Sequence, residues 1–392
     1  MQKSFSILIP ILFFISGCSD DNVTATDEYA SIKSTFGTAI DPANLANYAA
    51  QTKPAYILKD NTTNNTITNS GATLGRVLFY DKNLSKDNTI SCGSCHKREF
   101  AFGDSKIVST GVNGVTGRHS MRLVNSRFAN EQKFFWDERA TSLENQTTQP
   151  IQDHKEMGFS GTNGDANLAS LIVRLEALPY YQELFKLTYG DSKITEARLQ
   201  NALAQFVRSI QSFDSKYDVG RASAPNDNAA FANFSALENQ GKNLFLAAPQ
   251  FNASGERTGG GAGCHGCHRA PEFDIDPNSR NNGVVGVAGS TTVDLTNTRS
   301  PSLRDLLNAN GTLNSQAMHD GSFATLEAVI NHYNAIPSIA GNANLDPKLR
   351  PQGQFQKLLL TQNEKDALVA FLKTLTGTNI YTDKKWSDPF TP

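Results

Sequence analysis

The sequence lacks any long apolar run beyond its N-terminus, and it lacks an excess of charge of either sign. Its 36 Lys and Arg residues against 38 Asp and Glu give a formal net charge of −2. Without a basic excess, nucleic acid is not expected as a partner. A membrane-spanning helix needs about 20 apolar residues, and no later segment approaches that length. A composition of 39% hydrophobic and 19% charged residues indicates a soluble globular body.

The N-terminus carries a short apolar run that predicts export. Lys3 precedes this run, which covers residues 7–15, and Cys18 follows it closely. The run is too short to span a bilayer but is typical of a signal peptide. Residues 15–18 resemble the bacterial lipobox, in which Cys18 becomes lipidated; the alternative is an ordinary signal peptide with an incidental cysteine. We expect residues 1–18 to be a lipoprotein signal peptide of a Gram-negative-type bacterium, with a periplasmic or cell-surface product that reaches the membrane only through its lipid.

Cysteine is also scarce, since the chain contains 5. Apart from Cys18, they form two Cys-x-x-Cys pairs that are each followed by histidine, which is the attachment motif of c-type haem. Two thiols link one porphyrin, and the adjacent imidazole binds the iron. Two disulfides or a zinc site are the alternatives, although structural zinc pairs usually lie closer together in sequence. We expect two c-type haems, attached at Cys92, Cys95, His96 and at Cys264, Cys267, His268, with the two histidines as iron ligands.

Apolar periodicity predicts a mainly α-helical fold with long loops, because alternating strand patterns are scarce. The clearest helix is expected over residues 196–213, with one apolar face. Ser235 and Thr361 each begin a capping box, which predicts two more helices. We expect a tether and N-terminal extension over residues 19–65. Two haem domains should follow, over residues 66–228 and 229–392.

Further segments lie in a fixed order around the two haem motifs: Leu74–Asp81, Phe135–Ala140, Gln149–Ile151, Glu156–Gly158, Ser300–Arg304 and Met318–Gly321. Their order and spacing resemble those of the bacterial di-haem cytochrome c peroxidase family, including its MauG-like branch. The resemblance covers about residues 74–377. It implies two cytochrome-c-like domains, of which the first is peroxidatic and the second serves electron transfer, and it implies hydrogen peroxide as a substrate.

By this resemblance the haem on His96 cleaves peroxide, and Gln146, Pro150 and Glu156 match the distal positions above its iron. A glutamate there can carry a proton from one peroxide oxygen to the other. Glutamine can hold the oxygen or a water, and proline restricts access. The alternatives are a solvated carboxylate for Glu156 and a helix-and-turn role for the other two. Many relatives cap this iron with a histidine from the following loop, but residues 97–117 contain none, so His119 is the remaining candidate.

The resemblance assigns two aromatic residues to the second half of the reaction. Trp136 matches the tryptophan that lies between the haems and relays oxidising equivalents, although a buried core aromatic would have the same pattern. Tyr333 stands twelve residues after Gly321, where peroxidases of the family supply a methionine ligand and the MauG-like branch has tyrosine. A phenolate favours ferric and higher-valent iron. Tyr333 also fits the apolar face of a predicted helix as a core residue. The rival ligands are Met318, His319 and His332.

The family further implies a calcium ion between the domains, bound mainly by backbone oxygens. Asn314 and Gln316 match two of these positions, and His119 aligns with a third. Oxygen donors suit calcium. Gln316 stands where the family usually has proline, and Glu138 stands where it usually has glycine.

Three functions follow as hypotheses. The first is an enzyme that uses peroxide to oxidise residues, above all tryptophan, on a partner protein, which Tyr333 and the missing capping histidine favour. The second is a peroxidase that removes peroxide with electrons from a small cytochrome or cupredoxin. The third is an electron-transfer cytochrome without catalysis, which would have six ligands on both irons.

Overall fold

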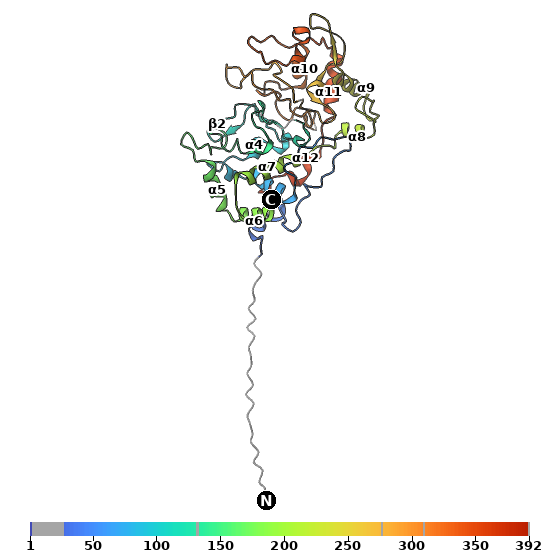
Figure 1. Ribbon diagram of the computed structural model, residues 1–392. Coiled ribbons are helices and arrows are strands. Elements are labelled where there is room, and N and C mark those ends of the chain that lie inside the picture. The colour runs from blue at the N-terminus through green and yellow to red at the C-terminus, as the bar shows by residue number, and fades with distance from the viewer. Residues whose placement is uncertain (2–26, 131–132, 276, 309, 391–392) are drawn as a thin grey trace.

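The computed structural model describes residues 1, 27–130, 133–275, 277–308 and 310–390. The described chain is mainly helical with few and short strands, as the sequence predicts (Figure 1). Cys18 and the proposed signal peptide lie outside the described residues, apart from Met1. Among the helices that are described, none combines the length and the apolar character that crossing a bilayer requires.

The helices are joined by long loops, and the strands form antiparallel two-stranded ribbons. The ribbons are β1 (Thr110–Gly111) with β2 (Gly114–Val115), β3 (Pro249–Phe251) with β4 (Arg257–Gly260), and β5 (His268–Arg269) with β6 (Asp274–Ile275). The α-helices are α1 (Ala30–Phe36), α2 (Asn69–Tyr80), α3 (Cys92–Cys95), α4 (Leu143–Thr147), α5 (Leu168–Glu176), α6 (Pro179–Tyr189), α7 (Glu196–Ser209), α8 (Lys216–Ala222), α9 (Ala236–Leu246), α10 (Leu326–Asn334), α11 (Gln362–Lys373) and α12 (Asn379–Thr382).

The predicted helices begin where their caps place them. The Ser235 and Thr361 capping boxes are both formed, at the first turns of α9 and α11. The helix expected over residues 196–213 is α7, which ends earlier, because Ile210 already has an extended backbone. Helix α11 runs from Gln362 to Lys373.

One helix crossing occurs twice, and each copy brackets one haem motif. In the first half, α2 crosses α7 at Gly75, where an added Cβ would lie 2.0 Å from the carbonyl oxygen of Ala202. In the second half, α9 crosses α11 at Gly241, where a Cβ would lie 1.8 Å from the carbonyl oxygen of Ala367. A glycine lets the two backbones touch at each crossing. The sequence shows no such repeat beyond the haem motifs themselves.

The two largest hydrophobic cores follow this division. The first includes residues up to Ile210, and the second begins at Tyr217, so the cores divide the chain earlier than the boundary at 228 that we expected. The C-terminal residues Ile380 and Trp386 return to the first core, which Figure 1 shows as the red helix α12 beside the N-terminal half.

From the start of α1 onward, the segment expected to be a tether and N-terminal extension contributes side chains to the first core. Ile32, Phe36, Ile40 and Tyr48 are buried in the first core. Ile32, Phe36 and Ile40 recur at four-residue spacing, which is the spacing of one apolar helix face. The polar residues around them hid this pattern. Residues 30–57 therefore belong to the folded body.

Candidate functional site

A cavity of about 480 Å³ brings the predicted residues of the first site together. Cys92, Cys95 and His96 line it, and so do Gln146, Pro150 and Glu156. Its volume lies within the range of about 300–1,000 Å³ that is usual for small-molecule and cofactor sites. Residues that lie up to 64 positions apart in sequence thus face one space.

The local structure around His96 fits a haem ligand. Ser91 caps α3, whose single turn carries Cys92 and Cys95 to the cavity wall. The Nδ1 atom of His96 lies 3.0 Å from the carbonyl oxygen of Phe102, so it carries the proton and donates. Burial lowers the pKa of His96, which keeps the ring neutral. Its Nε2 lone pair is then available to an iron, which is the arrangement of metal-binding histidines.

The alternatives to haem find no support in the geometry. Cys92, Cys95, Cys264 and Cys267 are free thiols, so neither pair forms a disulfide. In the described part of the chain, no group of three or more His, Cys, Asp or Glu residues converges as a metal site would require. The two motifs therefore do not meet around one zinc ion.

Glu156 faces the first cavity with a perturbed carboxyl group. Burial, and then the charge of nearby Asp153, raises the pKa of Glu156 to about 7. Within the described residues its carboxyl oxygens have no hydrogen-bond partner, whereas its backbone is held on both sides. Its amide donates to Asp153 Oδ1 at 3.1 Å, and its carbonyl oxygen accepts from the Val112 amide at 3.0 Å. A carboxyl group that titrates near neutrality in a cavity suits proton transfer.

Gly111 holds the Glu156 backbone in place, which sequence reasoning missed. The β1–β2 hairpin presses against residues 155–156, and a Cβ on Gly111 would lie 2.1 Å from the Lys155 carbonyl oxygen and 2.8 Å from Glu156 Cα. No side chain fits there. A glycine in a short hairpin is common, so the sequence alone gave no sign of this role.

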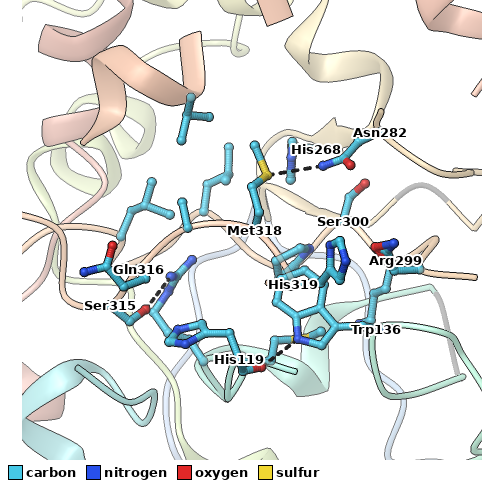
Figure 2. A pocket seen from close by; sticks show the side chains of 18 of the residues that line it. His119, Trp136, His268, Asn282, Arg299, Ser300, Ser315, Gln316, Met318 and His319 are labelled. Carbon is cyan, nitrogen blue, oxygen red and sulfur yellow. Dashed lines mark hydrogen bonds between the residues drawn. The ribbon is translucent and has the colours of Figure 1, made fainter. Parts of the chain in front are cut away.

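A second cavity, of about 100 Å³, lies beside His268 (Figure 2). Burial lowers the pKa of His268 to about 4, so this imidazole is also neutral and able to bind a metal. Tyr333, Met318 and His319 line the same cavity.

The four proposed ligands of the second haem differ in their freedom to bind. The Nε2 atom of His319 lies 2.9 Å from the Gly286 carbonyl oxygen. The Nε2 atom of His332 lies 2.8 Å from the Asn282 carbonyl oxygen, and His332 is not part of the cavity wall. In each ring, Nε2 therefore donates a hydrogen bond to the backbone and is not free to bind iron. Tyr333 and Met318 also line the cavity, and the oxygen of the one and the sulfur of the other both accept from Asn282 Nδ2, at 3.2 Å.

Trp136 lines both cavities. Its indole nitrogen donates to the carbonyl oxygen of His119 at 2.8 Å. Its own carbonyl oxygen accepts from the amides of Thr298, at 2.8 Å, and Arg299, at 3.0 Å. The indole ring meets the His319 ring edge to face, with centroids 6.3 Å apart. The side chain is thus fixed between the two sites from both halves of the chain.

His119 lies at the wall shared by the two cavities. Its Nδ1 atom lies 3.0 Å from the Lys106 carbonyl oxygen and 3.1 Å from that of Ile107, so the ring is held by the 106–107 loop. This leaves Nε2 as a buried lone pair without a hydrogen-bond partner among the described residues. The possible role of His119 as a cap on the first iron stays a prediction.

The expected calcium ligands are mainly backbone oxygens, and calcium at this position stays a prediction. The carbonyl oxygen of His119 accepts from the Trp136 indole nitrogen at 2.8 Å. The side-chain amide of Asn314 is turned to the Asp305 carbonyl oxygen and the Tyr381 hydroxyl, at 2.8 and 2.6 Å. Its Oδ1 is buried and has no hydrogen-bond partner among the described residues. Gln316 lies on the wall of the second cavity.

A guanidinium lies beside the residues proposed for calcium. Arg122 donates to the Ser302 carbonyl oxygen at 2.9 Å and to Ser315 Oγ at 3.3 Å, and Ser315 separates Asn314 from Gln316. Burial lowers the pKa of Arg122 to about 10, so it remains charged at neutral pH. A fixed positive charge repels a divalent cation, which disfavours calcium close to this guanidinium. Arg122 joins the two halves of the chain, and no sequence pattern pointed to it.

We expect a calcium chelator to leave the thermal unfolding and the visible spectrum of the holoprotein unchanged. Arg122→Leu should lower the free energy of unfolding by about 1–3 kcal/mol, because it leaves the two buried acceptors unpaired. Thermal denaturation with and without chelator measures both effects. Stability that is lost to the chelator and restored by added calcium would contradict this expectation.

Comparison with known proteins identifies the family. The family model of di-haem cytochrome c peroxidase matches residues 69–223. The methylamine utilization protein MauG of Methylophilus methylotrophus is 30% identical over 321 residues, which cover 80% of this chain and 84% of that protein. Cytochrome c551 peroxidase of Nitrosomonas europaea is 29% identical, with 78% and 80% covered.

Solved structures agree with this identification. The crystal structure of a MauG-like protein associated with microbial copper homeostasis has 30% sequence identity and a TM-score of 0.65, and the match covers 86% of this chain and 98% of that one. The diheme peroxidase BthA of Burkholderia thailandensis, at 18% identity and a TM-score of 0.57, shares the fold. The chain therefore belongs to the di-haem cytochrome c peroxidase family of oxidoreductases, which implies two c-type haems.

Proposed function

We propose that this chain cleaves hydrogen peroxide at the His96 site and passes the oxidising equivalents through Trp136 to the His268 site, in order to oxidise a partner protein. The observation that carries the proposal is the position of Trp136, which lines both cavities. The two haems, when bound, supply the iron that breaks the oxygen–oxygen bond and stores the oxidising equivalents.

The residues around the first site have distinct tasks in this proposal. Glu156 takes the proton from one peroxide oxygen and returns it to the other, so that the departing oxygen leaves as water. Its pKa of about 7 makes both steps accessible at neutral pH. Gln146, on α4, holds the peroxide or a water by hydrogen bonds, and Pro150 narrows the access.

At the second site, Tyr333 and His268 line one cavity and would both hold the iron of a bound haem. A phenolate oxygen is a hard, anionic donor that favours oxidised iron, so this site would hold oxidising equivalents better than it accepts electrons. The absence of histidine from residues 97–117 suits a first haem that reacts without prior reduction. Both features favour a MauG-like protein oxidation. The relatives named MauG and the solved structure of a MauG-like protein also favour this function.

The second candidate is a peroxidase that takes electrons from a small cytochrome or cupredoxin, and the relatives named cytochrome c peroxidase favour it. Met318 supports it too, because a thioether ligand would make the second haem an electron acceptor. A purely electron-transferring cytochrome agrees less well with a titratable carboxyl group that faces the first cavity. We place the protein outside the cytoplasm, as a lipoprotein held at Cys18.

Protein matured in a periplasm should carry two covalent haems per chain. Mass spectrometry of the intact polypeptide measures this directly. Replacing Cys264 and Cys267 by serine should leave one haem, which identifies the second attachment site. A wild-type chain with one haem, or with stoichiometric zinc, would overturn the proposal.

Peroxide turnover then separates the two candidate functions. With peroxide and a tryptophan-containing exported protein encoded nearby, the partner should gain mass in steps of oxygen atoms or lose hydrogen pairs, as mass spectrometry of its peptides would show. Rapid oxidation of a reduced small cytochrome or cupredoxin, with no change in the partner's mass, would instead support the second candidate.

A further inference from the structure

The wall of the second cavity includes a loop that is held unusually firmly. Asn281 is fully buried and uses its whole side-chain amide. Its Nδ2 donates to the carbonyl oxygens of Val284 and Asn297, at 3.2 and 3.4 Å. Its Oδ1 accepts from the Gly283 amide and from Asn342 Nδ2, both at 2.8 Å. This network fixes the backbone on either side of the next residue, Asn282.

The side chain of Asn282 has one possible orientation in this loop. Its Oδ1 accepts from the Val284 amide at 3.0 Å, and a backbone amide can only donate, so the oxygen and nitrogen cannot be exchanged. The Nδ2 group therefore faces the cavity. It lies 3.2 Å from Met318 Sδ and 3.2 Å from Tyr333 Oη, and Figure 2 shows the first of these contacts beside His268.

A single amide nitrogen thus contacts both donor atoms that remain candidates for the second iron. Its two hydrogens suffice for one bond to each. Met318 reaches this position from a left-handed backbone, with φ of 72°, which is strained for a residue with a side chain. Strain of this kind persists where surrounding contacts impose it. The sulfur is therefore held near Tyr333 by its surroundings.

The two bonds are unequal once an iron is present. A hydrogen bond to a charged oxygen is about twice as strong as one between neutral groups. The amide therefore stabilises a phenolate on Tyr333 more than it stabilises the neutral sulfur of Met318. This difference favours oxygen over sulfur as the ligand.

We propose that Asn282 is the positioning residue that selects Tyr333 over Met318 as the distal ligand of the second haem. The inference rests on the proposed function, since it requires a haem on His268. It gives a physical reason why a chain that contains a nearby methionine would still use tyrosine. It also makes one residue the determinant of whether this site stores oxidising equivalents or accepts electrons.

Asn282→Asp in the two-haem holoprotein tests the proposal. Aspartate keeps the shape and can still accept from Val284, but its second oxygen offers no hydrogen and repels a phenolate. The ferric protein should lose the phenolate–iron band in its optical and resonance Raman spectra. A sulfur–iron charge-transfer band should appear in the far red, and the reduction potential of the second haem should rise. An unchanged phenolate spectrum and potential would overturn the proposal, as would a high-spin second haem that binds neither donor.

Matched variants isolate the effect. Asn344→Asp makes the same substitution in a residue that donates to the Leu295 carbonyl oxygen, outside the cavity wall, and should leave the spectrum as in the wild type. Adding Met318→Leu to Asn282→Asp should abolish the sulfur band; its persistence would show that the sulfur is not Met318.

If Asn282→Asp fails to mature, Asn282→Leu removes the two N–H groups of the amide without adding charge. It should give two low-spin signals in electron paramagnetic resonance, one from each ligand, and a single phenolate signal would overturn the proposal.

The outcome is distinguishable from a failure of the proposed function. A chain with one haem removes the basis for both. Two haems per chain with a phenolate spectrum that Asn282→Asp does not alter would leave the proposed function intact and exclude only the selecting role of Asn282.

Discussion

Replacing Glu156 by glutamine should slow the reaction with hydrogen peroxide by about 10²- to 10⁴-fold, which is the usual contribution of a positioned proton-transfer group. Glutamine preserves the shape of the side chain but cannot carry the proton between the two peroxide oxygens. Because the Glu156 backbone is anchored through Asp153 and Val112, the fold around the cavity should survive. Stopped-flow mixing of the two-haem protein with peroxide measures the rate.

The pH profile gives a second test of the same group. With a pKa of about 7, the active carboxylate of Glu156 is lost as the pH falls, so the wild-type rate should drop about tenfold per unit below neutrality. The Gln variant should lack this dependence.

The raised pKa of Glu156 also predicts an effect on stability. Because the pKa of Glu156 is higher in the folded protein than in the unfolded chain, the free energy of unfolding falls as the pH rises from about 4.5 toward 7. Glutamine does not ionise, so Glu156→Gln should be more stable than the wild type at pH 8.

Glu176→Gln is the matched control, since this exposed residue at the end of α5 does not line the cavity. It should react at the wild-type rate with the wild-type pH profile. If Glu156→Gln, loaded with both haems, also reacted at that rate, proton transfer would have to be assigned to another group. Asp153, on the same cavity wall, would be the first to test.

Local patterns in the sequence were enough to predict the local structure. The capping residues Ser235 and Thr361 begin helices because a hydroxyl and a glutamate three residues on satisfy the first free amides, and both bonds are formed. The apolar face that contains Tyr333 predicted α10 and turned this side chain inward. The haem-attachment residues could be identified from the sequence because the attachment chemistry fixes the Cys-x-x-Cys-His spacing.

Contacts between distant segments could not be predicted in this way. Gly75 and Gly241 are ordinary helix residues in the sequence, and their purpose is visible only where each meets a carbonyl oxygen more than 120 positions later. Nothing in the sequence marks Arg122, whose guanidinium bonds Ser302 and Ser315 from the other half of the chain. Asn282 follows the same logic, because its partners Met318 and Tyr333 lie 36 and 51 residues away. Helix periodicity carries no information on such pairs.

Trp136→Phe should uncouple the two sites. Phenylalanine keeps most of the packing between the cavities but is much harder to oxidise than an indole, and it lacks the indole nitrogen that donates to the His119 carbonyl oxygen at 2.8 Å. The loss of that bond should cost about 0.5–1.5 kcal/mol of stability. We expect the first haem to react with peroxide at nearly the wild-type rate. The spectral response of the second haem should follow at least an order of magnitude more slowly, as rapid-mixing spectroscopy at two wavelengths would show.

The chain supplies its own control, because it contains one other tryptophan. Trp386 is buried in the first core, donates to Ser209 Oγ at 3.3 Å, and lines neither cavity. Trp386→Phe also removes an indole and a buried hydrogen bond, so it should cost similar stability while leaving the response of the second haem unchanged. Equal slowing in both variants would show that the effect is structural. A fast second response in Trp136→Phe would mean that the oxidising equivalents take another route, for which His119, on the wall of both cavities, is the nearest candidate.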